Sequence, residues 1–166
     1  RIIWLLLLVV VGFVSGFIMQ LKQEILESVI ALAFFLPLLS GSAGNAGTQS
    51  STVIIRGLAT GELEMKDIWK IIMKEMATGV IIGTALGLAS GLRAVITDAH
   101  HDIRLAVTVG ISMVFVVTLS TILGAIFPVF FKKIKLDPAL MSAPFIASII
   151  DIFSIFIYLS LAELIF

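Results

Sequence analysis

Cysteine is absent from this chain of 166 residues, and charged residues make up only 13% of it. The absence of cysteine excludes disulfides, thiol catalysis and cysteine-ligated zinc sites. Eleven basic and eleven acidic residues cancel, which excludes a basic nucleic-acid-binding protein and a polyacidic tail. What the sequence has in excess is apolar character, since 60% of its residues are hydrophobic and the mean hydropathy is +1.19. This composition predicts an integral membrane domain, because soluble domains are about a quarter charged.

Apolar runs long enough to cross a bilayer recur along the chain. A membrane-spanning helix needs about 20 apolar residues. We predict five such spans, over about residues 2–19, 25–58, 68–92, 103–131 and 138–166. The second is too long for one straight span, and Pro37 is expected to kink it because proline removes a backbone hydrogen bond. The predicted fold class is therefore all-α, with five transmembrane helices in each subunit.

Basic residues divide unevenly between the two sides of the membrane that five spans create. Eight fall on the side of the N-terminus: Arg1, Arg56, Lys66, Lys70, Lys74, Lys132, Lys133 and Lys135. Only Lys22, Arg93 and Arg104 fall on the opposite side. Because cytoplasmic loops carry an excess of lysine and arginine, we expect a cytoplasmic N-terminus and an external C-terminus. The expected location is the cell (plasma) membrane.

Asp151 is an acidic residue deep inside the fifth predicted span, between Ile150 and Ile152. An ionised aspartate at mid-membrane costs about 2.5–3.5 kcal/mol on insertion scales, and no basic residue lies at comparable depth in any span. The carboxyl group is therefore either neutral and bonded to neighbouring hydroxyls or part of an ion or proton site. We favour the ion site, because Ser148, Asp151 and Ser154 recur at helical spacing and place small polar groups along the same span.

Small and polar residues concentrate in the second predicted span. Gly41, Gly44, Thr48 and Thr52 share one helical face, and Asn45 adds a neutral oxygen beside them. One interpretation is a tight helix-packing seam. The other, which Asp151 leads us to favour, is the wall of a pore, since hard cations prefer oxygen ligands.

Three further features have simpler interpretations. Gly79, Gly83, Gly87 and Gly91 recur every four residues and predict a ridge for helix packing. Glu75 is expected to snorkel or to pair with a lysine, with an inner vestibule as the alternative. Asp137, before Pro138, is expected to cap the fifth span and also to help hold a cation at its inner mouth. No Ser-His-Asp order, HExxH motif or phosphate loop indicates an enzyme.

Two motifs resemble one known family. Pro37-Leu-Leu-Ser-Gly41-Ser-Ala-Gly44-Asn45-Ala-Gly47-Thr48-Gln49, followed by Arg56-Gly57-Leu58-Ala59, resembles the second span of the MgtE family of magnesium channels. Asp137-Pro138-Ala139, followed by Asp151, resembles the start and middle of that family's fifth span. The resemblance covers essentially the whole chain, with the same order of five spans.

The resemblance implies a homodimer in the lipid bilayer whose pore lies on the two-fold axis and is lined by spans two and five. It implies that Asp151 of both subunits holds a hydrated Mg²⁺ ion, with the backbone carbonyl of Ala147 facing the ion's waters. The pore-lining residues would be Gly41, Gly44, Asn45, Thr48 and Thr52, together with Ser148 and Ser154. Family members usually carry a cytosolic Mg²⁺-sensing region before the first span, so we expect this chain to be the membrane domain alone.

The resulting prediction is channel-type transport of Mg²⁺ down its electrochemical gradient, with other divalent cations left open. An ion-coupled secondary transporter, with Asp151 as the coupling carboxylate, is the alternative. Inverted repeats would favour that alternative, and the sequence shows none. A membrane anchor without transport activity is the remaining interpretation, and it predicts that Asp151→Ala is tolerated.

Overall fold

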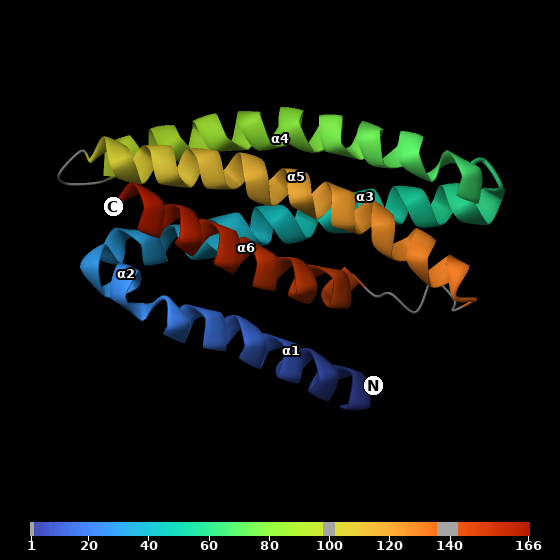
Figure 1. The fold of residues 1–166 in the computed structure, drawn as a ribbon, viewed down its shortest axis with the longest axis horizontal. Coiled ribbons are helices and arrows are strands. Elements are labelled where there is room, and N and C mark those ends of the chain that lie inside the picture. The colour runs from blue at the N-terminus through green and yellow to red at the C-terminus, as the bar shows by residue number, and fades with distance from the viewer. Residues whose placement is uncertain (1, 98–101, 136–142) are drawn as a thin grey trace.

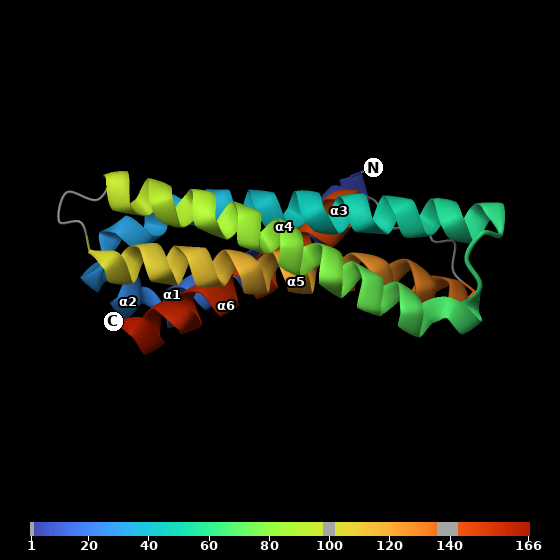
Figure 2. The ribbon, with the colours of Figure 1, turned by 90° about the horizontal axis from the view of Figure 1, so that it is seen from above.

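The computed structural model describes residues 2–97, 102–135 and 143–166, and all regular structure in these ranges is helical. This confirms the all-α prediction. The elements are α1 (Ile2–Leu21), α2 (Gln23–Ser28), the 3₁₀ helix η1 (Ile30–Phe35), α3 (Leu36–Thr60), the 3₁₀ turn η2 (Met65–Asp67), α4 (Ile68–Thr97), α5 (Ile103–Lys133) and α6 (Ala143–Ile165). The long helices lie side by side along one axis (Figures 1 and 2).

Four stretches of the described residues are long and apolar enough to cross a membrane: Ile30–Thr60, Ile68–Thr97, Ile103–Lys133 and Pro144–Ile165. The apolar part of α1 is shorter, from Leu5 to Leu21. At about 1.5 Å per residue it reaches about 26 Å, slightly less than the hydrocarbon core of a typical bilayer. The structure therefore shows four candidate spans where five were expected, and a membrane-spanning α1 remains a prediction.

The second predicted span differs from the single kinked helix that we expected. The chain turns at Val29, continues as η1, and only then enters α3. Pro37 lies in the first turn of α3 rather than in a helix interior. A first-turn residue has no intrahelical partner for its N–H, so proline fits there without bending the helix. Gly61 ends α3 at a φ of 77°, a left-handed conformation that favours glycine.

Glycines bring α4 and α5 into close contact. A Cβ atom at Gly83 would lie 2.9 Å from the Cα of Val114, and one at Gly87 would lie 2.6 Å from the carbonyl oxygen of Gly110. Gly79 approaches the Cα of Thr118 in the same way. The predicted packing ridge is thus confirmed, and α4 and α5 run together over most of their length (Figure 1).

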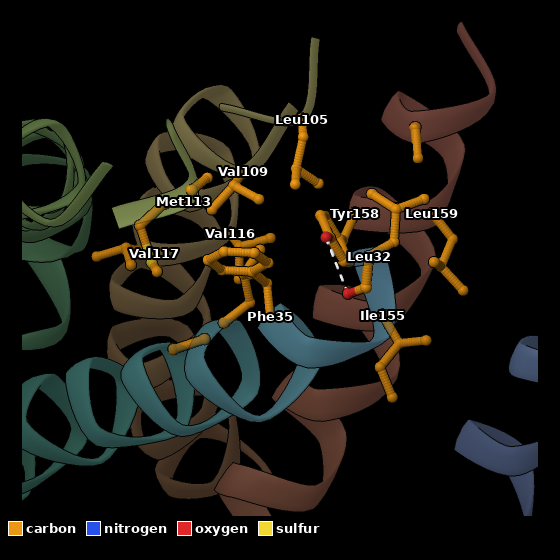
Figure 3. Close-up of a cluster of buried hydrophobic side chains, with 14 of the residues drawn as sticks. Leu32, Phe35, Leu105, Val109, Met113, Val116, Val117, Ile155, Tyr158 and Leu159 are labelled. Atoms are coloured by element: carbon orange, nitrogen blue, oxygen red, sulfur yellow. Dashed lines mark hydrogen bonds between the residues drawn. The ribbon is translucent and has the colours of Figure 1, made fainter. Parts of the chain in front are cut away.

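The main hydrophobic core joins η1 to α5 and α6 (Figure 3). Leu32 and Phe35 of η1 are buried against side chains such as Met113 and Val116 of α5. On the α6 side, the fully buried Tyr158 donates a hydrogen bond of 3.0 Å to the carbonyl oxygen of Leu32. The core therefore holds η1, which leads into α3, against α6.

The first helix packs mainly on α6 and lies at the edge of the bundle (Figure 1). Many of its apolar side chains are exposed, among them Phe13 and Phe17. Just after α1, Lys22 forms a 2.5 Å ion pair with Glu163 of α6. The apolar exposure of α1 matches a helix surrounded by lipid.

Candidate ion-binding site

Asp151 lies in the N-terminal half of α6, and its side chain is partly exposed. The side chain of Ser40 on α3 lies beside its carboxylate and interacts with it. None of the ion pairs within the described ranges involves Asp151. No three histidine, cysteine, aspartate or glutamate side chains gather within the described ranges, so no cluster of such ligands surrounds Asp151 there.

Close contact between α3 and α6 places Asp151 beside α3. A Cβ atom at Gly44 would lie 3.4 Å from the Cβ of Ala147, which is ordinary van der Waals contact. One turn further, Gly47 makes room for the side chain of Ile150. Because Gly44 and Gly47 follow Ser40 at helical spacing, these three residues lie along one edge of α3 that faces α6.

Next to that edge, α3 presents a polar stripe, which we define as Gly41, Asn45, Thr48 and Thr52. Gly41, Asn45 and Thr52 are exposed, and Thr48 is half-buried. The hydroxyl of Thr52 donates to the Thr48 carbonyl at 2.8 Å, which leaves the hydroxyl oxygen free to accept a hydrogen bond. The structure therefore leaves an uncovered row of small and polar residues on a helix long and apolar enough to span the membrane.

A second row on α3 is buried, and we call it the packed face: Ala43, Gly47, Ser50 and Ile54. The hydroxyl of Ser120 on α5 donates to the Ala43 carbonyl. At Gly47 the backbone of α3 comes so close to α5 that a Cβ atom at Gly124 would collide with it. One face of α3 is therefore a packing seam, and another face carries the exposed polar stripe. The pore-wall interpretation applies only to the exposed stripe.

The remaining predicted site residues fall into three groups. Ser148 is half-buried near Asp151, and its hydroxyl donates to the Pro144 carbonyl at 2.8 Å. Ser154 is buried against α5, and its hydroxyl donates to the Ile150 carbonyl of its own helix at 2.7 Å. The structure therefore does not bring Ser154 to the polar stripe. Asp137, predicted at the inner mouth, lies outside the described residues.

Sequence reasoning missed Ser40 as a partner of Asp151. Its signal was its spacing, because Ser40 precedes Gly44 by one helical turn on the edge that contacts α6. Sequence reasoning also missed Ser50 as a partner of Glu75, for which we expected a lysine partner or a snorkelling side chain, with an inner vestibule as the alternative. Its carboxylate instead accepts a 2.7 Å hydrogen bond from Ser50, and none of the ion pairs among the described residues includes it.

A multi-pass bundle of apolar helices, with a lone carboxylate beside an exposed polar stripe, has the features of an ion-transporting membrane protein. Residues 36–161 match the family model MgtE, described as a divalent cation transporter. The chain belongs to the MgtE family. This is a family of transporters and not of enzymes, in agreement with the sequence-based expectation.

Curated relatives agree with this family assignment. The chain is 39% identical over 164 residues to the magnesium transporter MgtE of Thermus thermophilus. It is 37% identical over 162 residues to the protein of that name from Bacillus subtilis, and 30% identical over 164 residues to the one from Enterococcus faecalis. These alignments cover at least 98% of this chain but only 36% of each relative.

Proposed function

We propose that this chain forms the pore of a channel-type Mg²⁺ transporter in which Asp151 binds the hydrated ion. The observation that carries the proposal is the position of Asp151, partly exposed in an apolar helix beside the polar stripe of α3. The relatives are named as magnesium transporters, and the chain spans about a third of their length. The transport activity therefore belongs to the whole protein, and this chain supplies its membrane pathway.

Electrostatics supports a divalent ion that keeps its water. Mg²⁺ gives up its waters reluctantly, so a site that holds the hydrated ion avoids most of the dehydration cost. At an effective dielectric of about 20, a carboxylate about 4.5 Å from the ion attracts it by about 7 kcal/mol. Two carboxylates about 9 Å apart repel each other by only about 2 kcal/mol. A monovalent ion gains half the attraction, which favours divalent cations.

A second copy of the chain would complete the site. One chain offers one Asp151 carboxylate and one uncovered polar stripe. A second chain related by a two-fold axis would add another of each, and the two chains together would shield them from lipid. In this arrangement the polar stripe, Gly44, Ala147 and Ser148 surround the ion path, and Asp137 stands at the cytoplasmic mouth. The proposal includes α1 as a fifth span, a cytoplasmic N-terminus, an external C-terminus and the plasma membrane as the location.

Asp151→Asn tests the proposal, because it removes the charge and keeps the shape of the side chain. The measurement is Mg²⁺ uptake by proteoliposomes that contain the purified protein, driven by a membrane potential. We expect uptake to fall to the level of empty vesicles while size-exclusion chromatography with light scattering still shows a folded dimer. Glu163→Gln is the matched control, since it neutralises an exposed carboxylate on the same helix, and it should retain uptake.

Two results would overturn the proposal in different ways. Normal uptake by Asp151→Asn would remove Asp151 from the ion path. Uptake that requires a proton or sodium gradient would replace the channel with a coupled transporter. A membrane potential alone should drive the ion inward, because it contributes about 2.3 kcal/mol per charge for each 100 mV.

A further inference from the structure

A hydrogen-bonded cluster joins three helices at the level of Ser50, on the packed face of α3. The Ser50 hydroxyl oxygen lies 2.7 Å from Oε2 of Glu75 on α4 and 2.8 Å from the carbonyl oxygen of Thr121 on α5. The Thr121 hydroxyl in turn donates to the Glu75 carbonyl at 2.9 Å. Ser50 is only 5% exposed, so water does not replace these contacts. The cluster ties α3 to both helices of the α4–α5 pair.

Packing alone does not account for a carboxylate at this position. Contacts at Gly79, Gly83 and Gly87 already join α4 to α5 without any ionisable side chain. An acidic side chain in a membrane span costs free energy that an alanine or leucine would not. Glu75 also borders a cavity of about 190 Å³ together with Arg56, Glu62 and Lys74, and the formal charges of these four side chains sum to zero. This balance makes the cavity a poor cation site. The bond with Ser50 is therefore the contact that distinguishes Glu75.

The bond with Ser50 lies on the side of α3 opposite to the polar stripe. Ser50 lies midway along the chain between Thr48 and Thr52, but it points to the opposite side of α3. An α-helix moves as a rigid rod over this distance, since its backbone hydrogen bonds link successive turns. A bond that stops α3 from rotating on its packed side therefore also fixes the polar stripe beside Asp151.

We propose that Glu75 is a positioning residue for ion conduction, which acts through Ser50 to hold the polar stripe of α3 at its distance from Asp151. This inference rests on the proposed function. It predicts that Glu75 influences which hydrated ions fit the pathway, because the placement of the polar stripe relative to Asp151 determines their fit. Glu75 itself does not contact the ion.

The test compares Glu75→Leu with Glu75→Gln. Leucine removes the carboxylate acceptor and leaves Ser50 only the Thr121 carbonyl, whereas the glutamine amide retains a polar partner for Ser50 on α4. The measurement is the ratio of Mg²⁺ to Ca²⁺ uptake in proteoliposomes that contain the full protein. We expect Glu75→Leu to change this ratio by about tenfold, the order expected of a displacement well below an ångström. Glu75→Gln should keep the wild-type ratio.

Thr78→Val is the matched control, because Thr78 lies one turn along α4 and its hydroxyl donates only to the Lys74 carbonyl of its own helix. It should keep the wild-type ratio. If Glu75→Leu does not fold, Ser50→Ala provides a second test, which removes the contacts of Ser50 with both Glu75 and Thr121. An unchanged ratio in a folded Glu75→Leu or Ser50→Ala variant overturns the inference, and so does a Glu75→Gln variant whose ratio has changed.

These outcomes are separate from those that test the proposed function. If the wild-type protein moves no Mg²⁺, the proposed function fails before Glu75 is tested. If the wild-type protein transports Mg²⁺ and Asp151→Asn does not, while the Glu75 and Ser50 variants keep the wild-type ratio, only the positioning role fails. A variant that merely loses stability would lower the yield of folded protein without changing the ratio of the two ions.

Discussion

Two rows of residues run along α3 with the same spacing, and only one of them is covered. The packed face has residues at positions 43, 47, 50 and 54, and the polar stripe has residues at 41, 45, 48 and 52. Each row contains one glycine and at least one hydroxyl side chain. Yet a Cβ atom at Gly41 would meet nothing within 4 Å, whereas one at Gly47 would lie 2.7 Å from the hydroxyl oxygen of Ser120.

This difference shows that the same residue types serve two purposes on one helix. On the packed face, the missing side chain lets two backbones touch, and the hydroxyl groups bond to a neighbouring helix. On the polar stripe, the same features leave space and free oxygen atoms. The assignment of each row depends on the helices beside it, so variants that affect one row and spare the other test the comparison.

The largest effect on stability should come from Gly124→Ala, at the crossing of α3 and α5. The added Cβ would lie 2.9 Å from the carbonyl carbon and 3.0 Å from the Cα of Gly47, and neither backbone can move freely. We expect a loss of about 3 kcal/mol in the free energy of unfolding, at the upper end of the range for overpacking. Thermal unfolding in detergent measures it.

Gly41→Ala is the paired variant on the polar stripe, where space is open. It should leave the unfolding temperature of the detergent-solubilised protein unchanged, because nothing surrounds the added methyl group. If the polar stripe lines the pore, the same variant should reduce Mg²⁺ uptake. Equal destabilisation by Gly124→Ala and Gly41→Ala would contradict the distinction between the two faces.

A smaller effect is expected from Tyr158→Phe, where η1 leads into α3. The variant keeps the buried ring and removes only the hydroxyl that donates to the Leu32 carbonyl. Leaving that buried carbonyl without this donor should cost about 1–2 kcal/mol. Chemical unfolding of the purified protein, compared with the wild type, measures the difference. No change in unfolding would mean that the hydrogen bond does not help to hold η1 against α6.

The smallest effect belongs to the ion pair between Lys22 and Glu163, which lies outside both faces of α3. Its side chains are 21% and 42% exposed, so solvent and salt weaken the attraction. A double-mutant cycle with Lys22→Ala and Glu163→Ala should give a coupling of about 0.5 kcal/mol. A coupling above that of the Tyr158 hydrogen bond would show that α1 is held more firmly than its contacts indicate.

Much of the fold and part of the site were predictable from the sequence. The apolar runs indicated the long helices, and the four-residue glycine repeat indicated a packing ridge, although not that α5 would be its partner. Asp151 was recognisable because a carboxylate in an apolar span costs free energy. The break at Val29 was not predictable in the same way, since η1 owes its place to contacts with α5 and α6. Ser40 was missed because its partner lies 111 residues further along the chain.

The sequence by itself determined that this is an all-helical membrane domain with one deeply placed carboxylate, because hydropathy and helical spacing are local properties of a chain. Only the tertiary structure decided which side of α3 is packed, which serine reaches Asp151, and that Glu75 bonds to Ser50. These outcomes depend on where α4, α5 and α6 come to rest. A helix rich in glycine and serine can pack on several of its sides, and its neighbours select among them.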